Sequence, residues 1–425
     1  MLIIIGAGPT GLSCGYRLKG KVNFLIVEKE NEVGGIASSV KKDGFIFDYS
    51  GHLLHLRWDE TKNFVLRLLD KNYLKIKRNA QIYLKGNYVD YPFQINLYNL
   101  PPDLKSNCVR DFLKATLNKK TDKELNFKKW ALETFGKSIC NYFMFPYNKK
   151  LFAYPLDKIT TKWLGDFVPK PNINMVLKGA YQRKIENIGY NPFFYYPKYG
   201  GIKNLADAMA KKIQNNIMKN SQVIKVSLKN KEIFLKNGQS LKYSKLINTM
   251  PLKKFILISD APYKIKEAAK NLKHNSIYIL NLGVKKINFK QHWIYFPEEK
   301  FIFYRLGFYS NFSPHLCPKN STSLYIEISV KENETIDFLK AEKSVIKDIL
   351  ELGIIKSEKD IITKTWLKVE CGYVIYDFLR EKSLEIIFNY LKENSVISTG
   401  RYGGWKYSFI EENIKDGFDT AKSLL

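Results

Sequence analysis

The stretch Leu2-Ile-Ile-Ile-Gly-Ala-Gly-Pro-Thr-Gly11 decides the fold of this chain. Its first four residues are an all-apolar run of the kind that is buried in a parallel sheet. The three glycines follow at once, and a helical pattern runs from Leu12 to about Leu18. A second apolar strand is expected from Phe24 to Val27, and it ends in Glu28. The pattern predicts a strand–helix–strand unit that binds a dinucleotide.

Each glycine of this unit has a separate physical role. Gly6 permits the tight turn, Gly8 lets the backbone approach a pyrophosphate, and Gly11 lets helix and strand pack closely. The N-terminus of the helix adds N–H groups and partial positive charge for the phosphates. Glu28 at the end of the second strand is placed to bind a ribose hydroxyl.

The residues that follow indicate which dinucleotide is bound. Gly34 and Gly35 come just after the acidic strand end, in the stretch Glu28-Lys-Glu-Asn-Glu-Val-Gly-Gly. This resembles the second signature of the glutathione-reductase-like FAD superfamily, which includes amine oxidases; an ordinary glycine-containing loop is the alternative. The segments at residues 196–201 and 246–251 resemble later parts of the same FAD domain. FAD is therefore the predicted cofactor, and the chain is expected to leave the FAD domain and return to it.

Composition bounds the class of protein. The 425 residues exceed what one hydrophobic core usually organises, so two or three domains are expected. Lys+Arg 69 against Asp+Glu 41 gives a formal charge of +28, a field that attracts nucleic acid, membrane surfaces or small anions. The excess is mostly lysine scattered along the chain, whereas nucleic-acid binding favours clustered cations with interleaved aromatics. A lysine-rich solvated surface is favoured, and no nucleic-acid partner is expected.

Cysteine usage and hydropathy bear on compartment. The 5 cysteines are widely spaced and form no C-x-x-C pair, which argues against a disulfide framework and against a metal site. The first strand begins directly after Met1, which leaves no room for a signal peptide. No run approaches the length of a membrane span. We expect a cytoplasmic protein without stable membrane insertion.

The expected fold class is α/β: a Rossmann-like FAD domain with an inserted helical subdomain and an antiparallel β-sheet substrate domain. The expected segments are FAD domain 1–60, a mostly helical covering domain 61–190, FAD domain 191–260, antiparallel sheet domain 261–375, and FAD domain 376–425.

A more specific resemblance begins at Gly44-Phe-Ile-Phe-Asp-Tyr-Ser-Gly-His52. The strand followed by Ser-Gly-His resembles the flavin-facing turn of UDP-galactopyranose mutases of the eukaryotic type. Gly51 would let the backbone lie against the flavin, and His52 would sit near its reactive edge. Taken alone, a histidine in such a turn is more often structural.

Further blocks extend this resemblance in the family's order, from residue 1 to about residue 410. They are Tyr91-Pro-Phe-Gln94, Phe143-Met-Phe-Pro-Tyr-Asn148, Trp163-Leu-Gly165, Trp293-Ile-Tyr295, Phe303-Tyr-Arg305, Ser310–Pro314, Gly372-Tyr373 and Gly400–Tyr407.

The resemblance implies a set of site residues. The implied catalytic residues are His52, Arg305 and Asn191. The implied FAD-binding residues are Gly6, Gly8, Gly11, Glu28, Gly34, Gly35, Gly51, Val223 and Arg401. The implied substrate-binding residues are Tyr91, Gln94, Phe143, Asn148, Phe152, Trp293, Tyr295, Tyr373 and Tyr407.

These residue types suit a nucleotide sugar on physical grounds. A uracil base needs a stacking surface and amide hydrogen bonds, which Tyr91, Phe143 and Gln94 offer. A diphosphate needs a guanidinium fork and hydroxyl donors, which Arg305 and the later tyrosines offer. Core packing is an equally good explanation for any single tyrosine, but the set together is more specific.

Three positions depart from the family pattern. Phe167 stands where the family has a second phosphate-binding arginine, and Lys162, Lys170 or Arg183 are the candidates to replace it. Phe152 stands in place of a tryptophan. Arg57 stands where the eukaryotic-type enzymes have a histidine that binds the nicotinamide cofactor. UDP recognition is therefore better preserved than recognition of the sugar.

The function that the resemblance implies is an FAD-dependent isomerase. It would interconvert pyranose and furanose forms of a UDP-sugar through an adduct between N5 of reduced flavin and C1 of the sugar. UDP-galactose is the first expectation, and UDP-arabinose or a related sugar stays open. NADPH or NADH would reduce the flavin, and the furanose would enter a surface glycan such as a capsule. A homo-oligomer is left open.

Two other functions remain as alternatives. One is an oxidoreductase of the amine-oxidase or protoporphyrinogen-oxidase type, which would line its cavity with aliphatic side chains. The other is a non-catalytic nucleic-acid or membrane-surface binder, which the dispersed charge disfavours.

Overall fold

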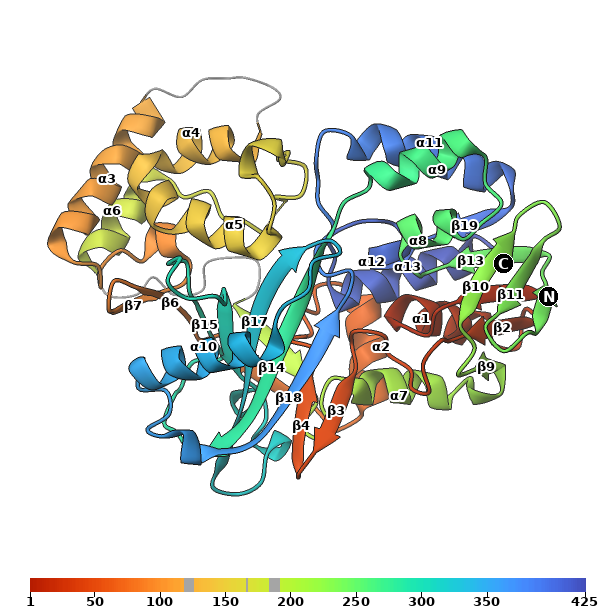
Figure 1. Cartoon of the computed structure of the whole chain (residues 1–425), viewed down its shortest axis with the longest axis horizontal. Coiled ribbons are helices and arrows are strands. Elements are labelled where there is room, and N and C mark those ends of the chain that lie inside the picture. Colours follow the sequence, from red (N-terminus) through yellow and green to blue (C-terminus); the bar gives the residue numbers. More distant parts are fainter. Residues whose placement is uncertain (118–125, 166, 183–191) are drawn as a thin grey trace.

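A five-stranded parallel sheet forms one half of the molecule. The computed structural model describes residues 1–117, 126–165, 167–182 and 192–425. The strands of this sheet run in the order β19-β13-β1-β2-β9. Their bounds are β1 Leu2–Ile5, β2 Phe24–Val27, β9 Ile217–Met218, β13 Lys245–Asn248 and β19 Val396–Ser398. They come from stretches far apart in the sequence, so the chain leaves this sheet and returns to it (Figure 1).

Helices cover both faces of the parallel sheet. On one side lie α1 Pro9–Leu18, α2 Asp59–Leu69, α7 Lys203–Lys211 and α13 Ile410–Lys422. On the other lie α8 Leu252–Leu257, α9 Tyr263–Asn271 and α11 Arg380–Glu393, with the short antiparallel sheet of β10 Val223–Ser227, β11 Glu232–Leu235 and β12 Ser240–Lys242. Helices α1 and α13 can approach closely because Gly417 has no side chain. A Cβ at this position would overlap Ser13.

A seven-stranded sheet forms the second half, in the order β18-β14-β17-β16-β15-β6-β7. Its strands are β6 Ala80–Leu84, β7 Asn87–Asp90, β14 Asn275–Lys285, β15 Trp293–Tyr295, β16 Arg305–Phe308, β17 Ser321–Lys331 and β18 Ile361–Val369. All neighbours are antiparallel except β15 and β6. Helix α10 (Phe338–Glu351) packs on one face over an apolar cluster.

A group of helices is a third feature of the molecule. It comprises α3 Pro102–Leu117, α4 Phe127–Ile139, α5 Phe145–Phe152 and α6 Ile173–Tyr181 (Figure 1). The stretch 61–190, expected to be mostly helical, also holds β5 Leu74–Lys77 and the β6–β7 hairpin. Residues 80–90 alternate polar and apolar around a tight Lys85-Gly86 turn, which is a hairpin signal.

The hairpin of β3 (Ser39–Lys42) and β4 (Phe45–Asp48) lies near the junction of the two halves. The α/β fold class expected from the sequence is confirmed. No helix among the described residues has the length and apolar character needed to cross a membrane.

Candidate functional site

A cavity of about 950 Å³ opens at the carboxyl ends of the parallel strands. Its walls combine the β1–α1 turn, residues 28–40, the turn after β4, the start of α8, the central strands of the large sheet and residues 401–413. In parallel α/β sheets ligands bind outside the carboxyl ends of the strands. The cavity therefore lies where the sequence predicts a dinucleotide.

The three glycines of the first turn each have a distinct surrounding. Gly6 has φ +101°, which a side chain would strain. A Cβ on Gly8 would meet no described heavy atom within 4 Å, so this position faces open space and lines the cavity. A Cβ on Gly11 would overlap the Gly6 carbonyl oxygen, and Gly11 does not line the cavity. The turn thus presents bare backbone to a ligand, as a pyrophosphate requires.

Glu28 fixes this turn from the neighbouring strand. Its carboxylate accepts hydrogen bonds from the Ala7 N–H at 2.7 Å and the Glu30 N–H at 3.0 Å. Burial raises the pKa of Glu28, and the two backbone hydrogen bonds oppose that rise. Gly35 lies beside Gly8, with its Cβ position 3.7 Å from the Gly8 Cα. The predicted FAD contacts Gly34, Gly35 and Val223 line the same cavity.

The turn after β4 brings His52 to the middle of the cavity wall. Ser50 has φ 86°, a left-handed conformation that is strained for a residue with a side chain. A Cβ on Gly51 would lie 2.5 Å from the Tyr325 hydroxyl, so only glycine fits there. Burial, with the Arg401 and Arg305 charges, lowers the pKa of His52 to about 3, so the ring is neutral. Its buried Nδ1 has no partner among the described residues.

Asp48 holds this turn in place. Its carboxylate accepts hydrogen bonds from the Ser39 hydroxyl at 2.6 Å, the Tyr196 hydroxyl at 2.5 Å and the Ile202 N–H at 3.3 Å. The Tyr309 hydroxyl donates to the Asp48 carbonyl oxygen at 2.6 Å. Complete burial raises the pKa of Asp48 to about 7.

Arg305 lies in the cavity wall as half of a buried ion pair. Strands β16 and β17 place it directly opposite Glu327, whose carboxylate accepts from Nε and, at 2.9 Å, from Nη2. The same Nη2 donates to the Ser50 hydroxyl at 3.2 Å, and that hydroxyl also donates to Glu327. The pair thus joins the predicted diphosphate-binding arginine to the turn that carries His52.

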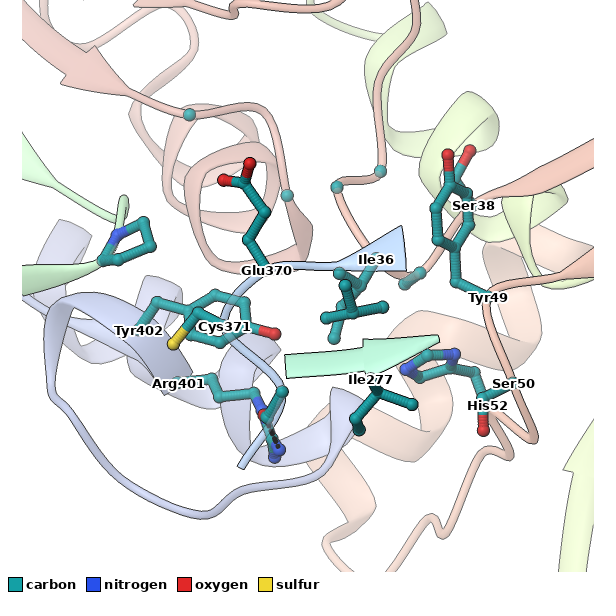
Figure 2. A pocket seen from close by; sticks show the side chains of 18 of the residues that line it. Ile36, Ser38, Tyr49, Ser50, His52, Ile277, Glu370, Cys371, Arg401 and Tyr402 are labelled. Atoms are coloured by element: carbon teal, nitrogen blue, oxygen red, sulfur yellow. Dashed lines mark hydrogen bonds between the residues drawn. The ribbon is translucent and has the colours of Figure 1, made fainter. Parts of the chain in front are cut away.

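Arg401 lies across the cavity from His52, next to Tyr402 and Cys371 (Figure 2). Its guanidinium donates to the carbonyl oxygens of Ser408 at 2.8 Å and Gly372 at 3.0 Å.

Tyrosines and a tryptophan form the wall predicted for the substrate. Tyr295, Tyr373, Tyr407 and Trp293 line the cavity. The rings of Tyr373 and Tyr407 stack at 5.6 Å. Their hydroxyls and the Arg305 guanidinium are polar groups in an otherwise aromatic surface.

Three further predicted substrate residues pack behind this wall and do not line the cavity. Tyr91 lies 5.1 Å from Tyr295 between ring centroids, and Phe143 lies 6.4 Å from the same ring. Phe152 packs edge-on against Tyr373 at 6.1 Å. They buttress the tyrosines that face the cavity.

The predicted polar contacts Gln94 and Asn148 bind backbone instead of facing the cavity. The Gln94 amide donates to the Pro169 carbonyl oxygen at 2.8 Å, and the Asn148 amide donates to the Met144 carbonyl oxygen at 2.7 Å. Asn191 and Arg183 lie outside the described residues.

The departures from the family pattern have clear surroundings. Phe167 packs edge-on against Tyr407 at 4.5 Å and against Phe409 at 5.1 Å. Arg57 pairs with Glu412 at 2.7 Å and lies 5.9 Å from the Phe409 ring. At position 167, the arginine of the family pattern is thus replaced by an aromatic side chain that packs against other aromatic rings.

The two candidate lysines do not reach this wall as cavity-lining groups. Lys162 pairs with Glu381 at 3.6 Å, and Lys170 lies 5.6 Å from the Trp130 ring.

Sequence reasoning missed a charged cluster at the edge of the cavity. Lys253 on α8 pairs with Glu332 at 2.5 Å, and His274 Nε2 lies 3.3 Å from the same carboxylate. No local motif marks these residues, because they come from three separate segments. Among the described residues, no group of three or more His, Cys, Asp or Glu side chains could hold a metal ion.

The residues present fit FAD. The bare Gly8 backbone suits a pyrophosphate, Glu28 lies where a ribose would follow, and His52 Nδ1 and Arg401 Nε are buried polar atoms left without partners in the described chain.

Comparison with known proteins agrees with this geometry. The family model of flavin-containing amine oxidoreductases matches residues 9–376. Among solved structures, the chain is similar to reduced UDP-galactopyranose mutase, with a TM-score of 0.94 and 26% identity over 100% of this chain and 93% of that one. The resemblance drawn from the sequence motifs is thereby confirmed.

More distant structures share the fold alone. Putrescine oxidase bound to putrescine has a TM-score of 0.66 at 13% identity, over 100% of this chain and 98% of that one. A fatty acid isomerase from P. acnes has a TM-score of 0.67 at 14% identity, with the same coverage.

Curated relatives match over a short region. A 4,4'-diapophytoene desaturase of Staphylococcus aureus (strain COL) is 35% identical over 105 residues, which is 24% of this chain and 20% of that protein. The chain thus spans about a fifth of the length of the curated relatives it matches.

Proposed function

The chain belongs to the flavin-containing amine oxidoreductase family, and within it we propose that this protein is an FAD-dependent mutase. It would interconvert pyranose and furanose forms of a UDP-sugar, with UDP-galactose as the first candidate and UDP-arabinose as the second. The observation that carries the proposal is the wall of Tyr295, Tyr373, Tyr407 and Arg305 in the cavity that fits FAD. Phenol and guanidinium groups suit a diphosphate and a sugar, whereas a hydrocarbon substrate needs an apolar surface.

The FAD site is formed by residues of the parallel-sheet half. The Gly6–Gly11 turn and Gly34-Gly35 would hold the pyrophosphate, and Glu28 the ribose. When bound and reduced, FAD would supply the nucleophile for the anomeric carbon of the sugar.

The protein's own contribution would be positioning and charge. Arg305 would compensate the charge that develops on the departing diphosphate, and the Tyr373 and Tyr407 hydroxyls would donate to its oxygens. The bidentate contact with Glu327 fixes the plane of the Arg305 guanidinium before any substrate arrives. His52 would act as a neutral ring, since protonation there is disfavoured.

A second candidate is an oxidoreductase of the amine-oxidase type on the same fold. The observation in its favour is Phe167, which gives the Tyr407 end of the cavity an aromatic wall in place of a second cation. NADPH or NADH is the proposed reductant for the mutase, whereas an oxidase would pass electrons from its substrate to oxygen.

The test is turnover of UDP-galactose and UDP-arabinose by the purified yellow protein, with and without dithionite. We expect furanose formation, separated by chromatography, only when the flavin is reduced. The control variant Arg305→Met should bind FAD but lose conversion. Conversion by oxidised enzyme, or hydrogen peroxide released on addition of amines, would contradict the mutase and favour the oxidase.

A further inference from the structure

Lys150 joins the group of helices to a loop that lies between two residues of the cavity wall. It belongs to α5, and its Nζ donates to the Phe296 carbonyl oxygen at 2.7 Å and to the Glu298 carbonyl oxygen at 3.1 Å. Both acceptors lie on the loop 296–304, which connects β15 to β16. One lysine side chain thus clamps the backbone of this loop at two points.

The loop is important because of the residues at its two ends. Tyr295 comes directly before it, Arg305 comes directly after it, and the two stand opposite each other in the pairing of β15 with β16. Both line the cavity. A displacement of the loop backbone is therefore transmitted to a tyrosine and an arginine of the proposed substrate wall.

The two end residues are anchored differently. Arg305 has an anchor of its own, because its guanidinium donates to the Glu327 carboxylate. The Tyr295 ring packs edge-on against the ring of Tyr147, which lies on α5, at 5.0 Å between centroids. Helix α5 thus acts on Tyr295 twice, through the Tyr147 ring and through the contact of Lys150 with the next residue of the chain.

Helix α5 is itself fixed to the large sheet. The Leu151 carbonyl oxygen accepts hydrogen bonds from Asn275 Nδ2 at 2.7 Å and from Ser329 Oγ at 2.9 Å. These donors belong to β14 and β17, and they hold the helix one residue beyond Lys150. The lysine therefore reaches the loop from a fixed base.

The two hydrogen bonds of Lys150 do not depend on its protonation state. Burial lowers the pKa of this lysine to about 7, although the charges of Asp348, Glu298 and Glu299 oppose that fall. The ammonium group carries three N–H bonds and the neutral amine carries two. Either form can donate to both carbonyl oxygens.

We propose that Lys150 is a positioning residue for Tyr295: it holds the loop 296–304 so that the Tyr295 ring stays in the wall that receives the UDP-sugar. This inference rests on the proposed mutase function and adds a determinant of substrate affinity to it. Because Arg305 keeps its own anchor, loss of the clamp should weaken substrate binding more than it slows the chemical step.

The first experiment is steady-state kinetics of Lys150→Met, which removes the donors and keeps an unbranched side chain. We expect KM for the UDP-sugar that the wild type converts to rise on the order of tenfold, as for a lost charged hydrogen bond. The value of kcat should stay within about twofold, with FAD still bound. Lys150→Arg keeps a cation with several N–H donors and should restore most of the affinity. Lys150→Gln, whose nitrogen lies one bond closer to the backbone, serves if the methionine variant does not fold.

Lys149→Met is the matched control. Lys149 precedes Lys150 on the same helix and pairs with Glu299 of the same loop at 2.8 Å, but both side chains of this pair are largely exposed. Exposed ion pairs contribute little, so KM should stay at the wild-type value. An equal rise of KM in the Lys149 and Lys150 variants would overturn the proposal.

A double-variant cycle tests whether Lys150 acts through Tyr295. Lys150→Met should raise KM in the wild-type background and have little further effect in a Tyr295→Ala background. Additive effects of the two substitutions would show that Lys150 acts elsewhere and that the proposal is wrong.

Hydrogen exchange separates this proposal from the mutase function. The Phe296 N–H donates to the Tyr304 carbonyl oxygen at 2.9 Å across the base of the loop. In holoenzyme without sugar nucleotide, amides of the loop should exchange faster in Lys150→Met than in the wild type or in Lys149→Met. Unchanged exchange would overturn the clamp even if KM rises. A wild type that converts no UDP-sugar would reject the mutase, whereas the exchange difference would still show that Lys150 holds the loop.

Discussion

Both carboxylate oxygens of the buried Glu327 accept hydrogen bonds from the Arg305 guanidinium. Arg305→Ala is expected to reduce mutase turnover by roughly 2–4 kcal/mol in activation free energy while FAD stays bound. It should also destabilise the fold by about 3–5 kcal/mol, because a buried carboxylate loses its partner. Steady-state kinetics and urea unfolding measure the two effects.

The double variant Arg305→Met with Glu327→Gln separates the effect on turnover from the effect on stability. It removes both charges of the pair, so most of the stability should return while turnover stays low. Turnover close to wild type in either variant would contradict the role of Arg305 at the diphosphate.

At the scale of elements, the β1–α1 turn offers a matched pair of substitutions. Gly8→Ala adds a methyl group that meets no described atom within 4 Å, so the apoprotein should fold normally. That methyl enters the space proposed for the pyrophosphate, and FAD affinity should fall about tenfold or more. Gly11→Ala places a methyl against the Gly6 carbonyl oxygen, so it should destabilise the fold itself by about 1–3 kcal/mol.

Flavin absorbance per protein and thermal unfolding of the apoprotein distinguish the two variants. Equal loss of apoprotein stability in both would show that Gly8 serves packing and not a ligand.

The network around Asp48 makes a second prediction at this scale. Asp48→Ala would leave the buried Tyr196 hydroxyl and the Ile202 N–H without their acceptor, at a cost of about 1–3 kcal/mol for each group. The turn that carries His52 should loosen, and FAD affinity should fall with it. Asp48→Asn keeps one oxygen acceptor and is expected to lose less. Titration of the apoprotein with FAD measures the affinities of the wild type and the two variants. An Asp48→Ala variant that binds FAD like wild type would contradict the positioning role.

The elements that sequence predicted correctly are those whose signals are local. The β1–α1–β2 unit is encoded within about 30 residues, where apolar runs and glycines follow in order. The β6–β7 hairpin was missed because its short alternation lies between helical stretches, and its strands are stabilised by pairing with β15, more than 200 residues away in sequence.

The whole molecule should lose stability in acid. Burial lowers the pKa values of His52, His55 and His292 to about 3, about 3 and about 4, against about 6.5 in the unfolded chain. Between pH 6.5 and 4 the unfolded chain therefore binds three protons that the folded chain does not. Each contributes about 1.4 kcal/mol of lost stability per pH unit.

Asp48 opposes this loss. Its folded pKa of about 7 lies above the unfolded value of about 3.9, so the folded state holds an extra proton in the same range and gains stability as pH falls. For these four groups the net difference is two protons, which corresponds to a loss of about 3 kcal/mol per pH unit near pH 5. Other buried carboxyls with raised pKa values, such as Glu28 and Asp416, reduce that loss. Urea unfolding at pH 7, 6 and 5 tests this, and His292→Asn should flatten the dependence. Stability that stays constant or rises on acidification would contradict the assignment.

The cofactor fold could be predicted from local sequence, because a glycine turn between an apolar strand and a helix constrains backbone angles and side-chain space within a dozen residues. The family could be predicted because its motifs recur in order along most of the chain. It also indicated Arg305 for a diphosphate and, through the family resemblance, Arg401 for the flavin. How those charges are used depends on contacts between distant segments. The register of β16 and β17 gives Arg305 a carboxylate, whereas the described segments around Arg401 bring it the carbonyl oxygens of Ser408 and Gly372, a thiol and phenols. The energy of a buried charge depends on groups that arrive from separate parts of the chain, so no local pattern records it.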